Sequence, residues 1–195
     1  MKGKTSQREG LLEKTLREAP VVRRGEYEYF IHPLTDAIPA LAPELLSEVC
    51  DRILKVANPG AEKIFTMEAM GIQIAAVLSQ KTGLPVNIVR KRQYWLPGEV
   101  VLDQSTGYSK GQMFINAVRK GDRLLVVDAV ISTGGTLIAV LNALKRIGAE
   151  VVDVVCVIER GDGIDKVKVA TGFDVKTLAK IEVRDMRVVV LKKTE

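Results

Sequence analysis

The sequence contains few of the residues from which metal centres and disulfide frameworks are built. Its 195 residues include one histidine, His32, and two cysteines, Cys50 and Cys156, which lie far apart in apolar segments. This set cannot supply a Cys/His zinc cluster, and it excludes a small scaffold held together by several disulfides. We expect both cysteines to be the buried free thiols of a cytoplasmic protein.

Long hydrophobic runs are also lacking. No apolar run approaches the roughly 20 residues that a membrane-spanning helix needs, and the polar first ten residues have no apolar centre of the kind found in secretory signals. We therefore expect a cytoplasmic protein with no membrane partner. Residues 1–10 are expected to be a flexible lead-in. Residues 11–195 are expected to form a single domain, since 47% hydrophobic and 27% charged residues are typical of a globular chain.

The chain is moderately basic. It has 29 lysines and arginines against 24 aspartates and glutamates, which gives a net charge of +5. This excess would suit a nucleic acid or a small polyphosphate equally well, so charge alone does not decide between them. The basic residues are scattered apart from short clusters such as residues 90–92, and no concentrated basic helix is available to enter a DNA groove. We therefore expect no nucleic-acid partner.

Hydrophobic patterning predicts an alternation of strands and helices. Short apolar runs bounded by turn residues indicate strands, and apolar residues spaced by three or four indicate helices. Such alternation is typical of an α/β protein with a mostly parallel sheet. The expected strands are 27–31, 63–67, 86–89, 112–118, 123–127, 151–158, 175–181 and 187–191; the expected helices are 11–16, one that begins at Pro43, 72–81, one that ends at Ile147, and 165–171; residues 90–111 are expected to be a long irregular segment.

The segment with the clearest functional pattern is residues 124–136. The apolar run Leu124–Val127 predicts a buried strand, Asp128 follows it, and apolar residues at helical spacing begin at Leu137. Backbone N–H groups and the positive end of the helix dipole favour a phosphate at such a turn, and glycine lets the backbone approach the anion closely. The alternative is an ordinary strand-to-helix turn. The turn residues are Ser132, Thr133, Gly134, Gly135 and Thr136.

Two further polar turns follow predicted strands. Glu68–Gly71 lies between a strand and a helix, and Ile158–Gly163 follows a later strand. Because ligands of parallel α/β sheets bind beyond the carboxyl ends of the strands, we expect these two turns and the turn after Asp128 to converge on one site. Arg90–Arg92 ends another strand and would bring cations to the same edge. The alternative for each charged turn is a solvated surface.

These segments together resemble the type I phosphoribosyltransferases. The apolar strand, its acidic residue and the loop that ends at Thr136 are similar to the family motif for 5-phosphoribosyl-1-pyrophosphate (PRPP). The resemblance covers about residues 11–191 and is strongest to the archaeal hypoxanthine/guanine phosphoribosyltransferases. It implies a Rossmann-like α/β fold with a mostly parallel five-stranded sheet and a small hood formed by about residues 11–40 and 175–195.

The resemblance also implies a role for each segment. Ser132–Thr136 would hold the 5-phosphate, and positions 128 and 129 would hold the ribose hydroxyls. The family has two acidic residues there, whereas Asp128 is followed by Ala129. We therefore expect PRPP affinity or turnover to be about tenfold to a hundredfold lower than with an aspartate at position 129. The other implied residues are the pyrophosphate contacts Glu68, Ala69, Met70, Gly71, Arg90, Lys91 and Lys110; the mobile-loop residues Leu96, Pro97, Gly98 and Glu99; and the base contacts Ile158, Arg160, Ile31 and His32.

The implied activity is transfer of a phosphoribosyl group from PRPP to a purine base, with release of pyrophosphate, by a homodimer. Mg²⁺ would be held by PRPP oxygens and water rather than by protein side chains alone. The resemblance favours hypoxanthine or guanine, and Arg160 could donate a hydrogen bond to their 6-oxo group unless it is simply part of an exposed charged turn. Two alternatives stay open. One is an adenine phosphoribosyltransferase. The other is a PRPP-sensing regulator on the same fold; such regulators usually have an added helix-turn-helix, for which we expect the roughly ten residues before the first helix to be too few.

Overall fold

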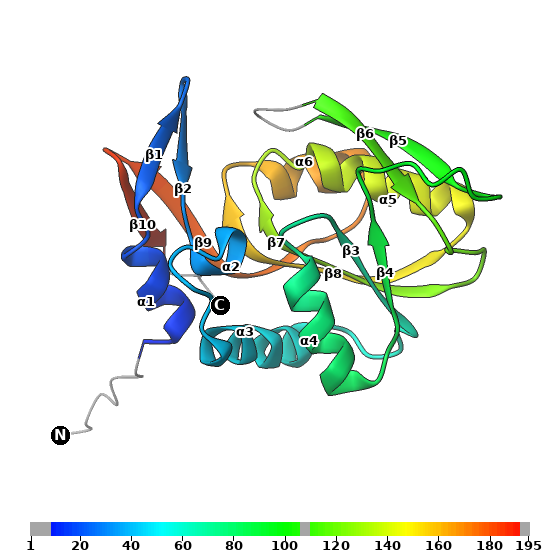
Figure 1. The fold of residues 1–195 in the computed structure, drawn as a ribbon, viewed down its shortest axis with the longest axis horizontal. Helices are drawn as coiled ribbons and strands as arrows, with labels where there is room; N and C mark the ends of the chain where they lie inside the picture. Colours follow the sequence, from blue (N-terminus) through cyan, green and yellow to red (C-terminus); the bar gives the residue numbers. More distant parts are fainter. Residues whose placement is uncertain (1–8, 106–109, 192–195) are drawn as a thin grey trace.

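A six-stranded sheet forms the centre of the computed structural model, which describes residues 9–105 and 110–191 (Figure 1). The strand order is β10-β9-β8-β7-β3-β4, and all neighbouring pairs are parallel except β10 with β9. The mostly parallel α/β prediction is confirmed, but the sheet has one strand more than the five predicted. The strands are β3 (Lys63–Met67), β4 (Val86–Val89), β7 (Arg123–Ile131), β8 (Glu150–Arg160), β9 (Lys176–Arg184) and β10 (Arg187–Leu191).

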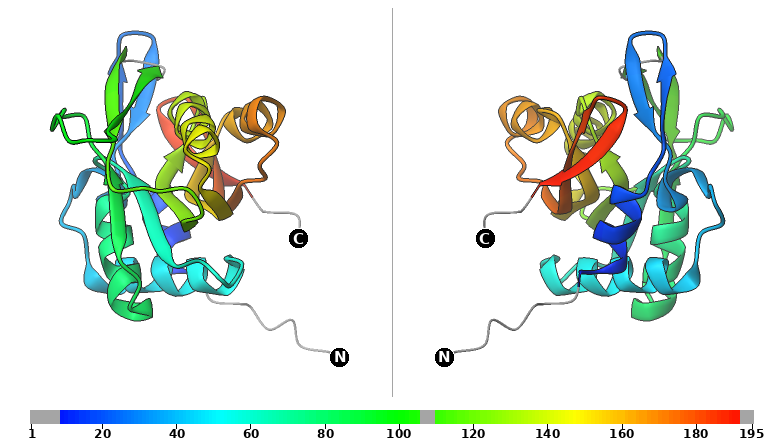
Figure 2. Two further views of the ribbon diagram at one scale, coloured as in Figure 1. Left: turned by 90° about the vertical axis from the view of Figure 1, so that its right-hand side faces the viewer. Right: turned by 90° about the vertical axis from the view of Figure 1, so that its left-hand side faces the viewer.

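Helices cover both faces of this sheet, as the two side views show (Figure 2). One apolar cluster joins α1, α3 and α4 to one face of the sheet, and a second cluster joins α5 and α6 to the other face. Buried parallel strands need this cover on both sides, which explains why their sequences are continuous apolar runs. The helices are α1 (Leu11–Arg17), α3 (Pro43–Val56), α4 (Ile72–Thr82), α5 (Gly135–Ile147) and α6 (Gly163–Thr171).

The helix ends follow the turn chemistry of the sequence. Pro43 occupies the first turn of α3, where its missing N–H would have no helical partner. Gly148 follows α5 in the left-handed conformation with φ +81°, and Gly83 follows α4 with φ +75°. A residue with a Cβ is strained at such positions. The predicted ends of these two helices at Ile147 and near Lys81 are therefore confirmed to within one residue.

A hairpin and a short helix stand beside the sheet at the N-terminal end of the described chain (Figure 1). The hairpin pairs β1 (Val21–Arg24) with β2 (Tyr27–Phe30), and α2 (Pro33–Asp36) follows it. Only β2 was predicted from the sequence. The C-terminal strands predicted as part of the hood instead extend the central sheet, where β9 pairs with β8 over residues 176–181.

A second hairpin corrects the prediction of an irregular segment over residues 90–111. β5 (Val100–Ser105) pairs antiparallel with β6 (Lys110–Ile115), and β5 packs against α5. The backbone of Arg90 exchanges two hydrogen bonds with Phe114, at 3.0 and 2.8 Å, so the end of β4 is tied to β6. The irregular part is therefore limited to residues 91–99 among those that the structure describes.

The topology places the candidate site. β3 and β7 are adjacent, and the chain leaves them for helices α4 and α5. The strand order reverses direction at this pair, which is where ligands of open α/β sheets bind. Across the described ranges, no helix is long and apolar enough to cross a membrane.

Candidate active site

A cavity of about 230 Å³ lies at the carboxyl ends of β3 and β7. The turns after both strands line it, and the hairpin β1–β2 and α2 supply further walls. Ten of the residues predicted for the site line this cavity, so the structure brings them together. They are Glu68, Ala69, Met70, Lys91, Asp128, Ser132, Thr133, Gly134, Gly135 and Thr136.

The segment Ser132–Thr136, called the phosphate loop below, joins β7 to α5. Gly134 precedes the helix with φ +78°, and Gly135 is the first helical residue. The N-cap residue is Gly134, which has no side chain to cap this helix start. Its first backbone N–H groups therefore lack helical acceptors and lie at the cavity, where they favour an anion.

Asp128 lies on β7, because this strand continues to Ile131 instead of ending at Val127 as predicted. The side chain is partly buried and lines the cavity, next to Cys156 of β8. Burial raises the pKa of Asp128 to about 7, although the Ala129 N–H donates a 2.7 Å hydrogen bond to its Oδ1 and opposes the rise. Ionising the Asp128 carboxyl in this buried position costs free energy. Hydrogen bonds that a ligand donates to it would therefore stabilise its charged form.

The turn Glu68–Gly71 follows β3 and precedes α4. Its first peptide bond, Glu68–Ala69, is cis. Gly71 itself does not line the cavity, but it packs closely behind it. A Cβ on Gly71 would lie 2.0 Å from Thr66 Oγ1 and 3.2 Å from Asp128 Oδ1. Glycine at position 71 therefore lets this turn approach the strand that carries Asp128.

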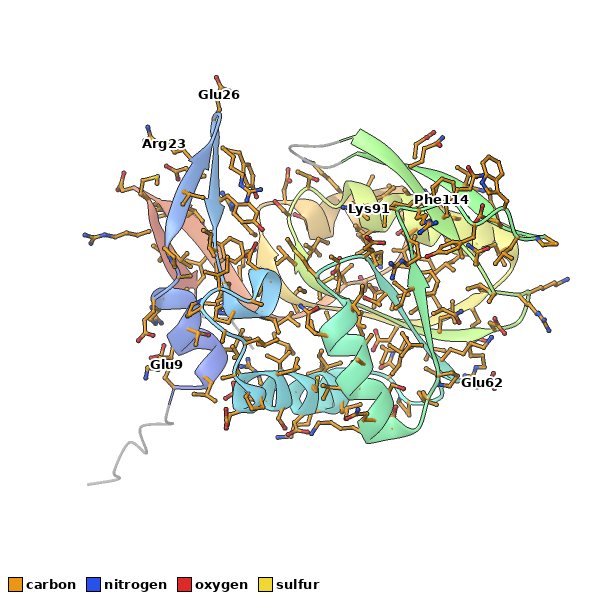
Figure 3. The ribbon with its side chains drawn as sticks, viewed as in Figure 1. Glu9, Arg23, Glu26, Glu62, Lys91 and Phe114 are labelled. Atoms are coloured by element: carbon orange, nitrogen blue, oxygen red, sulfur yellow. The ribbon has the colours of Figure 1, made fainter. Side chains whose placement is uncertain are left out.

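Two cations from the end of β4 lie beside this turn. The Nε atom of Arg90 is 3.0 Å from Glu68 Oε2, but its N–H is not directed at that oxygen, so the contact is an ion pair without an aligned hydrogen bond. The Lys91 backbone N–H donates to the same oxygen at 3.2 Å. Lys91 lines the cavity and lies near the upper end of β4 (Figure 3). Arg90 does not line it, but its ion-pair partner Glu68 does.

The wall opposite the turns comes from the hairpin and α2. Tyr27 and Tyr29 lie on the same face of β2 and line the cavity together with Phe30 and Thr35. The carboxylate of Asp36 accepts hydrogen bonds from the Tyr29 hydroxyl at 2.8 Å and the Thr35 hydroxyl at 2.6 Å. Tyr27 and Thr35 were not among the residues predicted for the site, although both line the cavity. The spacing of the two tyrosines by two residues, which puts them on one face of a strand, was the available signal.

His32 is a structural residue. Its side chain is completely buried, its Nδ1 accepts the Leu34 N–H at 3.2 Å at the start of α2, and its Nε2 is 2.8 Å from Thr15 Oγ1. Burial lowers the pKa of His32 to about 4, while nearby Asp36 opposes the change. Neither His32 nor Ile31 lines the cavity, and Ile158 is buried in the apolar core. The structure therefore does not place these three predicted base contacts at the site.

Arg160 ends β8 and lies beside the hairpin. Its guanidinium carbon is 4.4 Å from the centre of the Tyr27 ring. Its Nη1 is buried and has no hydrogen-bond partner within residues 9–105 and 110–191. Arg160 does not line the cavity, whereas Tyr27, on which it stacks, does.

The predicted mobile-loop residues form a tight turn at the surface. The Glu99 N–H donates to the Leu96 carbonyl oxygen at 3.0 Å, and Gly98 has φ +80°. The Glu99 carboxylate accepts hydrogen bonds from the Asn116 amide at 2.8 Å and from the Tyr94 backbone at 3.0 Å. Leu96, Pro97, Gly98 and Glu99 do not line the cavity. The side chain of Lys110 lies outside the described residues.

Ala129 points away from the cavity. Its side chain is completely buried in the apolar cluster that contains Val127 and α4, and it does not line the cavity. Successive residues of a strand point to opposite faces, so Asp128 and Ala129 cannot both face the same ligand without local rotation.

We expect Ala129→Asp to destabilise the protein without strengthening PRPP binding. A carboxylate at this position would be buried among apolar side chains, at a cost of about 2–4 kcal/mol. Thermal melting and PRPP titration by calorimetry measure the two effects, with Ala129→Ser as a smaller control. Binding of PRPP that is about tenfold tighter in the aspartate variant would show that the carboxylate reaches the ribose, as the family motif implies.

Comparisons with known proteins decide the family. The phosphoribosyl transferase domain matches residues 41–190. The chain is 56% identical over 182 residues to a hypoxanthine/guanine phosphoribosyltransferase of Methanocaldococcus vulcanius, and 53% identical over 182 residues to that of Methanococcus voltae. Each alignment covers 93% of this chain, and 100% and 97% of the two relatives. The chain belongs to the phosphoribosyltransferase family. The resemblance found in the sequence is thereby confirmed.

Solved structures of the family share the fold. An adenine phosphoribosyltransferase from Thermoanaerobacter pseudethanolicus superposes with a TM-score of 0.70 at 20% identity, covering 87% of this chain and 99% of the other. One from Leishmania tarentolae gives 0.71 at 17% identity and covers 88% of both chains. These likenesses confirm the type I phosphoribosyltransferase fold.

Proposed function

We propose that this phosphoribosyltransferase acts in purine salvage, converting PRPP and hypoxanthine or guanine to the nucleoside monophosphate and pyrophosphate. One observation carries the proposal. A single cavity is lined by a helix-start loop suited to a phosphate, by a carboxylate suited to ribose hydroxyls, and by a turn with a lysine suited to pyrophosphate. The three groups match the three parts of PRPP.

Each group would act on its own part of PRPP. The N–H groups and hydroxyls of Ser132–Thr136 would bind the 5-phosphate. Asp128 would accept hydrogen bonds from the ribose hydroxyls, and Lys91 with the Glu68–Gly71 turn would hold the pyrophosphate. Fixed donors that face the leaving pyrophosphate stabilise the charge that develops as the bond to ribose breaks. Catalysis would therefore come mainly from positioning and electrostatics.

The donor set at the cavity fits Mg²⁺ held chiefly by the substrate. Magnesium prefers oxygen ligands and keeps several waters. Asp128 is a carboxylate at the cavity that is not engaged in an ion pair with another described residue, whereas Glu68 is paired with Arg90. Within the described ranges, no three His, Cys, Asp or Glu side chains are grouped as a metal site of their own. The ion, when bound with PRPP, would neutralise part of the pyrophosphate charge.

The base would lie between the hairpin and the sheet. Tyr27, Tyr29 and Phe30 offer aromatic surface to a purine. The unpartnered Nη1 of Arg160, behind Tyr27, could donate to a 6-oxo group after a rearrangement of the stacked pair. The names of the relatives from Methanocaldococcus vulcanius and Methanococcus voltae support the same 6-oxopurines. We further propose a cytoplasmic homodimer.

The base preference is tested by incubating the protein with PRPP, Mg²⁺ and one of hypoxanthine, guanine, xanthine or adenine. We expect inosine and guanosine monophosphate by chromatography, with pyrophosphate released in equal amounts. Reactions that lack PRPP are the control. Adenosine monophosphate as the main product would favour the adenine alternative, and absence of any nucleotide would contradict the proposed enzyme.

A further inference from the structure

Two turns of the chain are in close backbone contact, and one of them lines the cavity. One is the phosphate loop, and the other joins β8 to α6 and ends at Gly163. Gly163 is buried and begins α6. A Cβ on Gly163 would lie 2.3 Å from the carbonyl oxygen of Ser132 and 2.9 Å from the nitrogen of Gly134. Both distances are shorter than real Cβ contacts, so this approach requires glycine at position 163.

The contact is reciprocal. A Cβ on Gly134 would lie 2.8 Å from the Gly163 carbonyl oxygen and 3.1 Å from Val167 Cγ2, one turn further along α6. Gly161, in the same turn, differs: a Cβ there would be 3.6 Å from Ser132 O, which is an ordinary contact, and glycine is favoured by its φ of +86°. Of the two glycines Gly161 and Gly163 in this turn, only Gly163 is therefore crowded against the phosphate loop.

We infer that Gly163 is a positioning residue for the phosphate loop. Its missing side chain lets the first turn of α6 lie against the backbone of Ser132 and Gly134 and so fix where the loop N–H groups point. This inference rests on the proposed function, in which those groups bind the 5-phosphate. Preorganised donors lose their effect when they are displaced, so a shift of a few tenths of an ångström matters here.

The same turn is also connected in sequence to a residue that contacts the hairpin wall of the cavity. It follows directly on Arg160, which stacks on the cavity residue Tyr27. A change at Gly163 that acted on the whole turn would alter the binding of the base and PRPP together. A change that acts through the phosphate loop alters PRPP binding selectively. Comparing the change in PRPP binding with the change in base binding therefore distinguishes an effect on the phosphate loop from a disruption of the whole turn.

The test is Gly163→Ala. We expect the Kd for PRPP and the KM for PRPP to rise at least about tenfold, while the KM for the purine base changes less than about threefold. The matched control is Thr171→Ala at the other end of α6. It removes the 2.7 Å hydrogen bond from the Thr171 hydroxyl to the Val167 carbonyl oxygen, and Thr171 itself does not line the cavity. The control is expected to leave the Kd for PRPP within about twofold of the parent value.

A second variant, Val167→Leu, and ligand-free crystal structures test the same contact in two further ways. If Gly163→Ala does not fold, Val167→Leu enlarges the neighbour of Gly134 instead and is expected to raise the Kd for PRPP about threefold. Ligand-free crystal structures of parent and variant show whether the Ser132–Gly134 backbone has moved. A parent protein that fails to bind PRPP would overturn the proposed function, but the two crystal structures would still show whether Gly163 positions the loop. An unmoved loop, or an unchanged Kd for PRPP in a parent that binds it, would overturn the inference.

Discussion

Asp128→Asn is expected to lower kcat/KM for PRPP at least about 100-fold, because in the proposed binding mode an amide cannot replace a charged acceptor for the ribose hydroxyls. The substitution keeps the size of the side chain, and its amide oxygen can still accept the Ala129 N–H. Steady-state kinetics with saturating base measure the loss. A kcat/KM equal to that of the parent would show that Asp128 does not contact the ribose.

The same variant is expected to be more stable than the parent at pH 8. The pKa of Asp128 in the folded chain is about 7, whereas an unfolded aspartate titrates near ~3.9. The folded state therefore favours the neutral carboxyl. The resulting contribution to stability is present below about pH 4 and is lost as the pH rises through about 7.

Contact of Asp128 with the cavity limits the gain in stability that is expected from the Asp128→Asn substitution. A pKa difference between about 4 and about 7 corresponds to about 4 kcal/mol, and partial contact with solvent reduces the expected gain to about 1–2 kcal/mol. Thermal melting at pH 8 and pH 4.5 measures it: the Asp128→Asn substitution should raise Tm by about 4 °C at pH 8 and by much less at pH 4.5.

Asp153→Asn is the matched control for both measurements. Asp153 is another buried carboxylate, on β8, but it is ion-paired with Lys176 at 2.7 Å and accepts the Asn58 N–H at 2.7 Å, away from the cavity. Neutralising it should lower stability and leave kcat/KM unchanged. A loss of stability in both variants at pH 8 would contradict the assigned cost of ionising Asp128.

The main features of the site could be predicted because parallel strands end at one edge of a sheet. The turns after Met67 and Val127 are polar and glycine-containing, and each is followed by a helical pattern. Their convergence followed from topology alone. The length of β7 could not be predicted in this way. Asp128 looks like the end of a strand, but the long strand β8 supplies partners up to the pair Ile131–Glu159, and tertiary pairing overrides local preference.

The hairpin β5–β6 and the side chain of His32 show a second reason why some predictions from the sequence were wrong. Val100–Ser105 becomes a strand only because it pairs with Lys110–Ile115 and packs on α5, and a window of local sequence does not contain those partners. His32 illustrates the same problem for side chains. A lone histidine beside predicted base contacts suggests a ligand contact, whereas its neighbours Thr15 and Leu34 give it a structural role.

Gly71→Ala is expected to impair both folding and activity. A Cβ at this position would lie 2.0 Å from Thr66 Oγ1 and 3.3 Å from the Val127 carbonyl oxygen. Thr66 is completely buried, and its hydroxyl donates a 2.8 Å hydrogen bond to that carbonyl oxygen. To avoid the clash, Thr66 must rotate and lose this bond, or the turn must move away from Asp128. We expect the free energy of unfolding to fall by about 2–3 kcal/mol and kcat/KM to fall at least about 100-fold.

A double variant identifies the cause of this loss. Thr66→Ala removes the Oγ1 atom that the new Cβ would meet, so Gly71→Ala should cost less in that background. We expect a coupling free energy of at least about 1 kcal/mol in denaturant unfolding, and about tenfold recovery of kcat/KM relative to Gly71→Ala alone. Gly111→Ala is the control, because a Cβ there meets no atom of the described part of the chain within 4 Å. Strictly additive effects of the two substitutions would show that Gly71 is needed for some reason other than its contact with Thr66, and the close packing of the turn against β3 and β7 would then not explain the loss.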